Sequence, residues 1–178
     1  MQKISVAQIM YSLDLYLFAL INGYAKKSRL LDFFGIFCAR NLAYVLIAWL
    51  FIFSYFHGNG MHDFLIPMSA GIISVLAVNE IMYLFYKRKR PMDLVPNIVL
   101  IPKPISPAFP SSHASFFFAL SFTLLLYNTP LAIIFTVFAL CISLSRIFCG
   151  VHWPSDILGG ILSALISFLT VVSILAFF

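Results

Sequence analysis

Two histidines, an aspartate and two arginines lie in short polar segments of an otherwise apolar chain. The segments are residues 87–91, 110–113 and 145–156. They contain Arg90, His113, and the group formed by Arg146, His152 and Asp156. Ionisable groups beside membrane-type apolar runs are costly and are usually functional. We therefore begin with the chemistry that these side chains could perform together.

The arginines and Ser111 are suited to hold a phosphate group. A guanidinium group matches two phosphate oxygens with paired hydrogen bonds. Arg90 and Arg146 lie at predicted helix ends, and Ser111 lies where a helix is predicted to begin. Free backbone N–H groups and the helix dipole favour an anion at such a start. The serine can cap the helix or donate to a phosphate oxygen.

The histidines could supply a nucleophile and an acid. Asp156 follows His152 by four residues, and a carboxylate there can fix the tautomer of the imidazole and stabilise its cation. A neutral, oriented imidazole is a competent nucleophile toward phosphorus. His113 follows the predicted helix start and can deliver a proton. Together the segments predict hydrolysis of a phosphate ester or anhydride.

Each residue also has a simpler interpretation. Ser111 alone fits a helix cap, Lys87–Arg90 alone fits a topogenic or headgroup-binding cluster, and Asp156 alone fits a charge at a helix N-terminus. These interpretations do not explain why all the groups fall on one face. A non-catalytic membrane protein that binds or transports a lipid phosphate stays open as an alternative. It would need the arginines but not His152 or Asp156.

The composition indicates an integral membrane protein. Hydrophobic residues make up 62% of the 178 residues and charged residues 10%, whereas soluble domains have roughly 25% charged residues. The net charge of +5 is clustered beside membrane segments, which argues against nucleic-acid binding. Cys38, Cys141 and Cys149 are odd in number and lie in or beside apolar segments. No disulfide framework is expected.

The apolar runs predict an all-α, polytopic transmembrane bundle with five to six spans, each needing about 20 residues. The predicted spans are residues 31–56, 64–86, 111–127, 131–148 and 154–178. Residues 4–24 are predicted to form an amphipathic helix at the interface, with a sixth crossing as the alternative. Residues 87–110 hold six of the nine prolines and are predicted to form an irregular loop. Residues 1–178 are predicted to be one membrane-embedded domain.

The order of the spans places the polar segments on one face of the membrane. If the span 64–86 ends on one face, the span 111–127 begins on that face. The chain then crosses twice and returns before residue 149. Arg90, His113 and His152 are therefore expected to meet at one membrane surface.

The polar segments resemble the signatures of the type-2 phosphatidic acid phosphatase superfamily. Ser145-Arg146, five residues, His152, three residues and Asp156 match the third signature, which is highly specific. Pro110-Ser111-Ser112-His113 resembles the second, proline-serine-x-histidine, and Arg90-Pro91 resembles the end of the first. The resemblance covers roughly residues 80–178.

The resemblance implies a helical membrane phosphatase that needs no metal and no cofactor. By position, His152 would be the nucleophile and form a phosphohistidine, Asp156 would orient it, and His113 would protonate the leaving oxygen. Preorganised donors would hold the phosphate and its developing charge. These phosphate-binding residues are expected to be Arg90, Ser111, Ser112, Arg146 and Lys87.

The chain departs from the signatures at two positions. Tyr83 stands where the first signature has a lysine, seven residues before the arginine. Lys87 or Lys89 is expected to supply the charge from another direction, or the site works without it. Some bacterial members that resemble undecaprenyl-diphosphate phosphatases also lack this lysine, which favours that subgroup. Ser112 stands where glycine is common.

The expected substrate is an amphiphile whose phosphate lies at headgroup depth. The resemblance favours undecaprenyl diphosphate, with undecaprenyl phosphate as the product. Phosphatidic acid, phosphatidylglycerol phosphate and lipid A phosphates are the alternatives. The expected partners are the lipid phosphate and the bilayer, with no nucleic acid, and the oligomeric state stays open.

The positive-inside rule and the resemblance predict different faces for the site. Lys and Arg residues outside the polar segments, such as Lys26, Lys27, Arg29 and Arg40, share the face of the predicted site. Taken literally, the rule places that face in the cytoplasm. Enzymes of the superfamily that this chain resembles generally act on the outer face. We expect a cell-membrane protein with an extracytoplasmic site.

Overall fold

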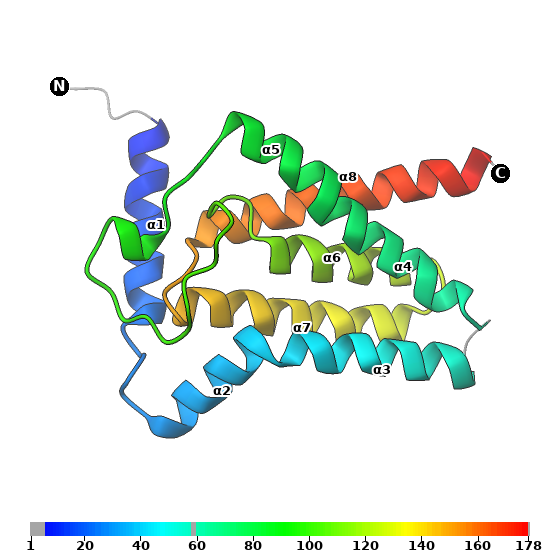
Figure 1. Ribbon diagram of the computed structural model, residues 1–178, viewed down its shortest axis with the longest axis horizontal. Helices are drawn as coiled ribbons and strands as arrows, with labels where there is room; N and C mark the ends of the chain where they lie inside the picture. Colours follow the sequence, from blue (N-terminus) through cyan, green and yellow to red (C-terminus); the bar gives the residue numbers. More distant parts are fainter. Residues whose placement is uncertain (1–5, 58–59, 178) are drawn as a thin grey trace.

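The computed structural model describes residues 6–57 and 60–177, which form helices and loops without a strand (Figure 1). The elements are α1 (Val6–Asn22), α2 (Arg29–Arg40), α3 (Leu42–His57), α4 (His62–Ile73), the π-helix η1 (Ser74–Asn79), α5 (Glu80–Phe85), the 3₁₀-helix η2 (Pro91–Asp93), α6 (Ser112–Leu124), α7 (Thr129–Phe148) and α8 (Pro154–Phe177). The all-α prediction is confirmed for this part of the chain. Residues 1–5, 58, 59 and 178, which the predicted domain also included, lie outside the described residues.

The helix α6 lies inside the bundle, against α4, α7 and α8 (Figure 1). Most of its side chains are buried, including Phe117, Phe118 and Leu120. A helix that is apolar all round is typical of such an interior position. Burial of α6 fixes its first turn, which carries Ser112 and His113, against the ends of the neighbouring helices.

Two small residues bring the starts of α6 and α8 together. A Cβ atom on Gly160 would lie 2.7 Å from the Cβ of Ala114 and 2.9 Å from the carbonyl oxygen of Ser111. Both distances are too short for a side chain, so glycine is required where the two helices approach. This contact places the second polar segment beside the third.

The prediction of a helical membrane protein is supported, whereas the predicted number of spans is not confirmed. Three helices among the described residues are long and apolar enough to cross a membrane, namely the continuous helix His62–Phe85, α7 and α8. A fourth crossing is possible if α2 and α3, which are bent by 54°, act together. With 13 residues, α6 is shorter than the roughly 20 that a span needs. The five to six predicted spans are therefore not confirmed by length and composition.

The helix α1 runs across one end of the bundle rather than along α6 and α7 (Figure 1). Its side chains Met10, Leu13 and Tyr16 are exposed. Only a few of its residues, such as Phe18, enter the core. A helix was predicted here, and its amphipathic, interfacial placement is not confirmed.

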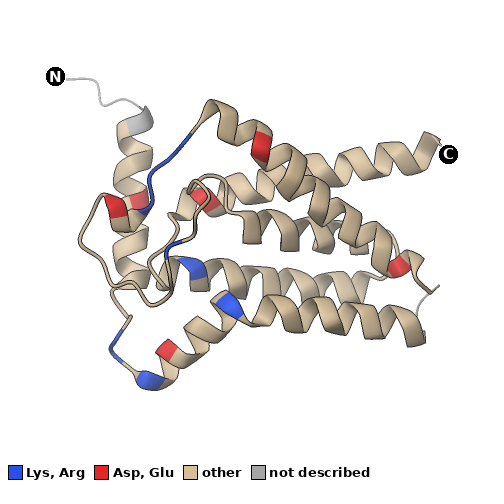
Figure 2. Cartoon of the chain, in the orientation of Figure 1, with Lys and Arg blue, Asp and Glu red and all other residues tan. Residues whose placement is uncertain are grey.

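Basic residues gather at the end of the bundle where α1 lies (Figure 2). The loop that connects α5 to α6 is irregular except for η2, as its prolines predicted. This loop, the start of α6 and the turn between α7 and α8 all meet at that end (Figure 1). It is therefore the place to look for the predicted site.

Candidate active site

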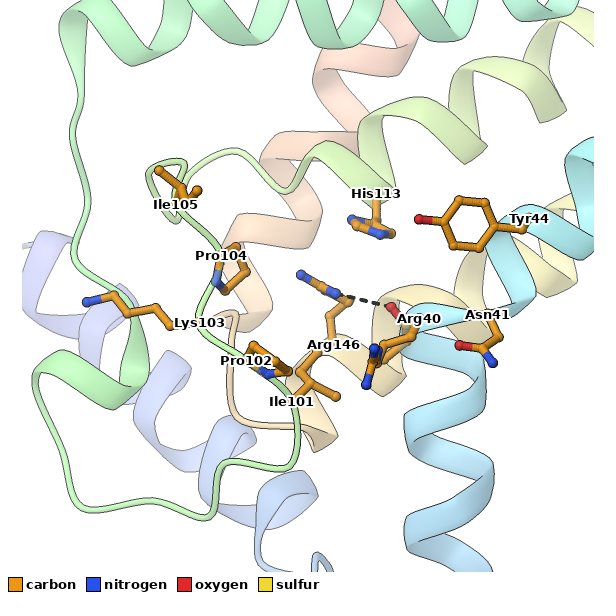
Figure 3. A pocket seen from close by; sticks show the side chains of 11 residues that line it. Arg40, Asn41, Tyr44, Ile101, Pro102, Lys103, Pro104, Ile105, His113 and Arg146 are labelled. Carbon is orange, nitrogen blue, oxygen red and sulfur yellow. Dashed lines mark hydrogen bonds between the residues drawn. The ribbon is translucent and has the colours of Figure 1, made fainter.

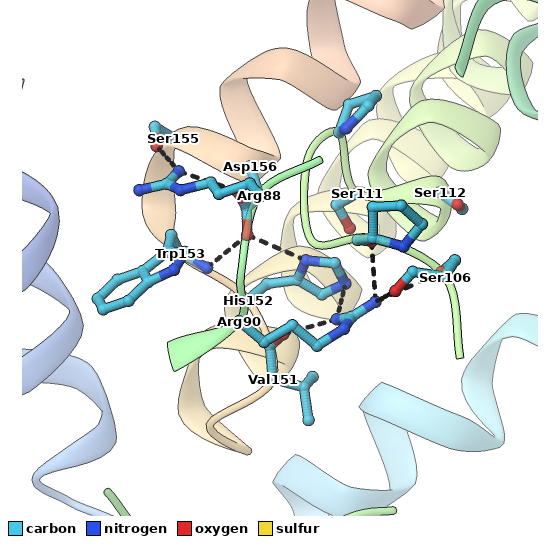
Figure 4. Close-up of polar contacts among 12 residues, drawn as sticks. Arg88, Arg90, Ser106, Ser111, Ser112, Val151, His152, Trp153, Ser155 and Asp156 are labelled. Atoms are coloured by element: carbon cyan, nitrogen blue, oxygen red, sulfur yellow. Dashed lines mark hydrogen bonds and ion pairs between the residues drawn. The ribbon is translucent and has the colours of Figure 1, made fainter. Parts of the chain in front are cut away.

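The three polar segments come together as the order of the spans predicted (Figure 4). Arg90 Nη1 donates to the carbonyl oxygen of Val151 at 2.7 Å and lies 3.1 Å from His152 Nε2. The backbone N–H of Ser111 donates to the carbonyl oxygen of Asp156 at 3.0 Å. Residues more than 40 positions apart thus form one cluster around His152.

The His152 imidazole is held by a buried carboxylate. Nδ1 lies 3.2 Å from Asp156 Oδ2, and that oxygen also accepts from the backbone N–H of Trp153 at 2.8 Å. Asp156 is fully buried and His152 is 3% exposed. A carboxylate at Nδ1 assigns the proton to that nitrogen, which leaves the lone pair on Nε2. The nitrogen predicted to be the nucleophile therefore faces Arg90.

Burial also keeps this imidazole neutral. Loss of hydration lowers the pKa of His152 to about 4, although the hydrogen bond and charge of Asp156 act in the opposite direction. The positive charges of Arg90 and Arg146 lower the pKa further. At neutral pH His152 is therefore uncharged, and its lone pair is available.

A tight turn after α7 aims His152 at this cluster. Gly150 has φ of +81°, a conformation that disfavours side chains. A Cβ atom there would lie 2.4 Å from the carbonyl oxygen of Ile98. Pro154 then begins α8, a position that suits its fixed φ. The turn holds His152 and Asp156 on the same side of the helix start.

Several buried donor atoms on the Nε2 side have no partner among the described residues. They are Arg90 Nε, Arg146 Nε and Ser111 Oγ. Unpaired buried polar atoms are uncommon in folded proteins because each costs free energy. Donors of this kind beside a nucleophile fit the oxygens of a phosphate group. Arg90 and Ser111 were both predicted to hold phosphate.

The arginines are held firmly by backbone oxygens. Arg90 Nη2 donates to the carbonyl oxygens of Ser106 and Pro107 at 3.0 and 3.1 Å. Arg146 Nη1 donates to the carbonyl oxygen of Ala39, at the end of α2, at 3.1 Å. Such contacts fix the direction of each guanidinium before any substrate binds, which is the preorganisation that electrostatic catalysis requires.

His113 lies in the first turn of α6 and lines a pocket of about 500 Å³ (Figure 3). Arg146 lines the same pocket and points toward His113 (Figure 3). Arg40 and Tyr44, from the junction of α2 and α3, lie on the other side. The predicted acid is thus open to a pocket, whereas the predicted nucleophile is buried.

Tyr83, which replaces the lysine of the first signature, points toward the second segment. Its hydroxyl group donates to the carbonyl oxygen of Pro110 at 3.2 Å and lies 3.1 Å from Ser112 Oγ. Tyr83 is 7% exposed. It therefore holds the start of α6 through neutral hydrogen bonds and brings no positive charge.

Lys87 lies apart from the cluster. It is exposed and lines a different pocket, together with Asp14 and Phe109. Its neighbour Arg88 turns inward instead, and Arg88 Nη1 lies 2.9 Å from Asp156 Oδ1. Phosphate binding by Lys87 stays a prediction, and the basic residue that contacts the carboxylate of Asp156 is Arg88.

Asp14 completes this inner network and was missed from the sequence. Arg88 Nη2 lies 2.6 Å from Asp14 Oδ2, and Asp14 Oδ1 accepts from the backbone N–H of Ser155 at 2.9 Å. The second contact satisfies a free N–H group in the first turn of α8. A lone acidic residue in an apolar helix was the available signal, because such a group needs a partner.

Residues 64–177 match the PAP2 superfamily, and the match includes all three polar segments. Undecaprenyl-diphosphatase BcrC of Bacillus subtilis (strain 168) is 31% identical over 157 residues, which cover 84% of this chain and 78% of that protein. The bacitracin transport permease protein BcrC of Bacillus licheniformis is 31% identical over 165 residues, which cover 89% of this chain and 80% of that protein.

The helices are also arranged as in a solved relative. The crystal structure of Aquifex aeolicus LpxE superposes with a TM-score of 0.69 at 25% sequence identity. The match covers 90% of this chain and 95% of that chain. The similarity therefore extends beyond the polar segments to nearly the whole bundle.

Proposed function

The chain belongs to the PAP2 superfamily, and we propose that it hydrolyses undecaprenyl diphosphate to undecaprenyl phosphate and inorganic phosphate. The family resemblance is confirmed, and the chain is a membrane lipid phosphatase. A relative that bears the name undecaprenyl-diphosphatase supports the substrate. The observation that carries the proposal is the buried His152–Asp156 pair beside the unpartnered donors of Arg90 and Ser111.

In the first step His152 Nε2 attacks the terminal phosphorus of the diphosphate. A nitrogen–phosphorus bond forms, and the bond from this phosphorus to the bridging oxygen breaks. His113 delivers a proton to the departing oxygen, so the first product is undecaprenyl phosphate. Asp156 accepts the hydrogen bond from Nδ1 and stabilises the positive charge that develops on the imidazole.

In the second step water replaces His152 on phosphorus. His113, now neutral, accepts a proton from the water as its oxygen bonds to phosphorus. The nitrogen–phosphorus bond breaks, and inorganic phosphate leaves. Arg90, Arg146, Ser111 and the backbone of Ser112 would stabilise the three equatorial oxygens in both steps. His113 then holds its proton again, and His152 is neutral.

For the membrane we propose five crossings, with α6 as the short fifth one and α1 at the interface. The central position of α6 supports its crossing, because α4, α7 and α8 cover it. The transverse direction of α1 and its exposed apolar side chains support the interface (Figure 1). Asp14 ties α1 to α8, which supports residues 1–178 as one phosphatase domain.

We place the site on the extracytoplasmic face, where undecaprenyl diphosphate would be reached from outside the cell. The gathering of basic residues at the site end favours the opposite face by the positive-inside rule (Figure 2). Several of these residues, however, have roles in the site. The end of α8 lies at the opposite end of the bundle (Figure 1). A reporter fused to the C-terminus should therefore be cytoplasmic, and an external reporter would contradict this placement.

The direct test of the proposal is phosphate release by the purified protein in detergent. The substrates would be undecaprenyl diphosphate, phosphatidic acid, phosphatidylglycerol phosphate and lipid A. We expect release from undecaprenyl diphosphate, unchanged by EDTA. His152→Ala should lower kcat by about 10⁴-fold or more, as expected when a nucleophile is removed.

The matched control is His62→Ala, because His62 begins α4 at the far end of the bundle. This variant should keep wild-type activity. Thermal melting would show that both variants are folded. A folded wild-type protein that releases phosphate from no lipid would contradict the proposal. A preference for another lipid would keep the enzyme class and replace the substrate.

Transport is the second candidate function, because one relative is named a bacitracin transport permease protein. A transporter would need the arginines but not the ordered contact between His152 and Asp156. Bacitracin uptake by protein-containing vesicles would test it. Transport that survives His152→Ala, without phosphate release by the wild type, would favour this function.

A further inference from the structure

The pocket beside His113, which His152 does not line, has a charged wall. Arg40, the last residue of α2, lines this wall with Asn41 and Tyr44 (Figure 3). Within residues 6–57 and 60–177, no carboxylate forms an ion pair with Arg40. Arg146, by contrast, is held by the carbonyl oxygen of Ala39. The pocket therefore presents a second guanidinium whose charge is not neutralised by the protein.

The position of His113 identifies which part of a substrate enters this pocket. The acid must lie beside the leaving oxygen, whereas the phosphorus must lie beside His152. His113 lines the pocket with Arg40, whereas His152 and Arg90, which contact each other, do not line it. The group that leaves is therefore directed toward Arg40.

A smaller, apolar pocket of about 260 Å³ continues from the same residues. It is shared by Arg40, Tyr44 and His113, and it extends along Ile47 of α3 and Phe116 of α6. A leaving group with a phosphate at one end and a hydrocarbon chain at the other would fit a charged pocket that continues into an apolar one. The charged end would contact Arg40, and the first units of the chain would lie between α3 and α6.

We propose that Arg40 binds the phosphate that remains on the lipid, which makes the enzyme selective for lipid diphosphates over lipid monophosphates. This inference rests on the proposed function. When a diphosphate is cleaved, the leaving group is a phosphate, and the guanidinium can neutralise the charge that develops on it. When a monophosphate is cleaved, the leaving group is an alcohol that needs a proton from His113 and no second cation.

The bend between α2 and α3 positions Arg40 for this role. The two helices meet at an angle of 54°, and Asn41 lies at the junction. Arg40 and Tyr44, on successive helices, line the same pocket (Figure 3).

The test compares two substrates that share one chain, farnesyl diphosphate and farnesyl monophosphate. We expect Arg40→Gln to lower kcat/KM for the diphosphate by about 10- to 100-fold, the range for a lost charge-assisted hydrogen bond. The value for the monophosphate should change by less than about twofold. Arg40→Lys keeps the charge but loses the paired donors, so its loss should be intermediate.

Arg29→Gln is the matched control, because Arg29 begins the same helix that Arg40 ends. It should leave both substrates unaffected. If Arg40→Gln lowers both substrates equally, or neither, the inference is overturned while the proposed function stands. If the wild type hydrolyses neither substrate nor any lipid phosphate, the proposed function fails and the inference with it. Arg40 is exposed, so the variant is expected to fold, and thermal melting would verify this.

Discussion

The two nitrogens of His152 face different surroundings. On the Nδ1 side, Asp156 contacts Arg88, and Arg88 contacts Asp14. Each charged side chain there touches one of opposite charge, and we call this the paired side. On the Nε2 side, the guanidinium group of Arg90 forms no ion pair with a carboxylate of the described residues, nor does that of Arg146. Buried donors of Arg90, Arg146 and Ser111 also have no partner there.

The protein itself supplies the partners of the charged groups on the Nδ1 side. On the Nε2 side, a substrate would supply the partners of the unpaired donors. The paired side can hold the imidazole in one orientation at all times. The unpaired side keeps its donors at a cost in free energy, because buried unsatisfied groups destabilise the fold. A phosphate group would satisfy those donors. The following predictions alter one side at a time, beginning with the largest expected effect.

Breaking the paired side at its centre should have the largest effect. Asp156→Ala removes the acceptor of His152 Nδ1 and the partner of Arg88. We expect kcat to fall by about 10³- to 10⁴-fold, as for loss of the orienting carboxylate in a catalytic triad. Steady-state phosphate release measures this. A loss of less than tenfold would show that the imidazole is oriented without the carboxylate.

Altering the unpaired side should have a smaller effect. Arg90→Lys keeps a positive charge but cannot reproduce the contacts to Val151, Ser106 and Pro107 or the free Nε donor. We expect kcat/KM to fall by about 10²- to 10³-fold, as for removal of one transition-state donor. Lys89→Arg is a suitable control, because Lys89 is exposed next to it. Full activity in Arg90→Lys would contradict this role for Arg90.

A change at Asp14, the residue of the paired side farthest from His152, should affect stability more than activity. Asp14→Asn leaves the partly buried Arg88 with Asp156 as its remaining carboxylate partner, and the loss of one charged contact costs about 1–3 kcal/mol of folding free energy. Activity should fall only about tenfold, because Asp156 still contacts His152. Melting temperature and kcat should be measured together. The stability losses of Asp14→Asn and Arg88→Met should add to less than their sum in the double variant, because both changes remove the same Asp14–Arg88 ion pair.

The pH dependence should report the buried state of His152. Its pKa is lowered to about 4 from the ordinary 6.5, so the unfolded chain binds this proton more readily than the folded protein. The stability linked to His152 is therefore fully present above pH 6.5 and is lost as the pH falls toward 4. The acid limb of kcat/KM, which reports protonation of the His152 nucleophile, should lie near pH 4 to 5. An acid limb near pH 6.5 would indicate an exposed, ordinary imidazole.

Much of the fold and of the site could be predicted from the sequence. The apolar runs predicted the positions of α7 and α8 closely, because their length and composition leave few alternatives. The spacing of Arg146, His152 and Asp156 predicted that these residues lie together in a phosphatase site. The order of the spans placed Arg90 and His113 at the same end, which the structure confirms.

The break between α2 and α3 was not predicted. Residues 31–56 look like one span because both helices are apolar, and the sequence gives no proline between them. The bend places Ala39 against Arg146 and opens the pocket that Arg40 lines. The local pattern of apolar residues does not indicate such a bend, because contacts with a helix distant in the chain stabilise it.

The sequence does not show whether Lys87 or Arg88 points into the site. By itself the sequence determined that basic residues precede Pro91 and that they reach the site end. Only the tertiary structure decided which of them turn inward. The backbone is extended at Tyr86 and at Arg90, the two ends of the segment, and in an extended chain neighbouring side chains point in opposite directions. Arg88 and Arg90 therefore face Asp156 and His152, whereas Lys87 and Lys89 are exposed. The orientation of a loop side chain depends on what it contacts, and Arg88 contacts both Asp156 and Asp14, the latter 74 positions away in the chain.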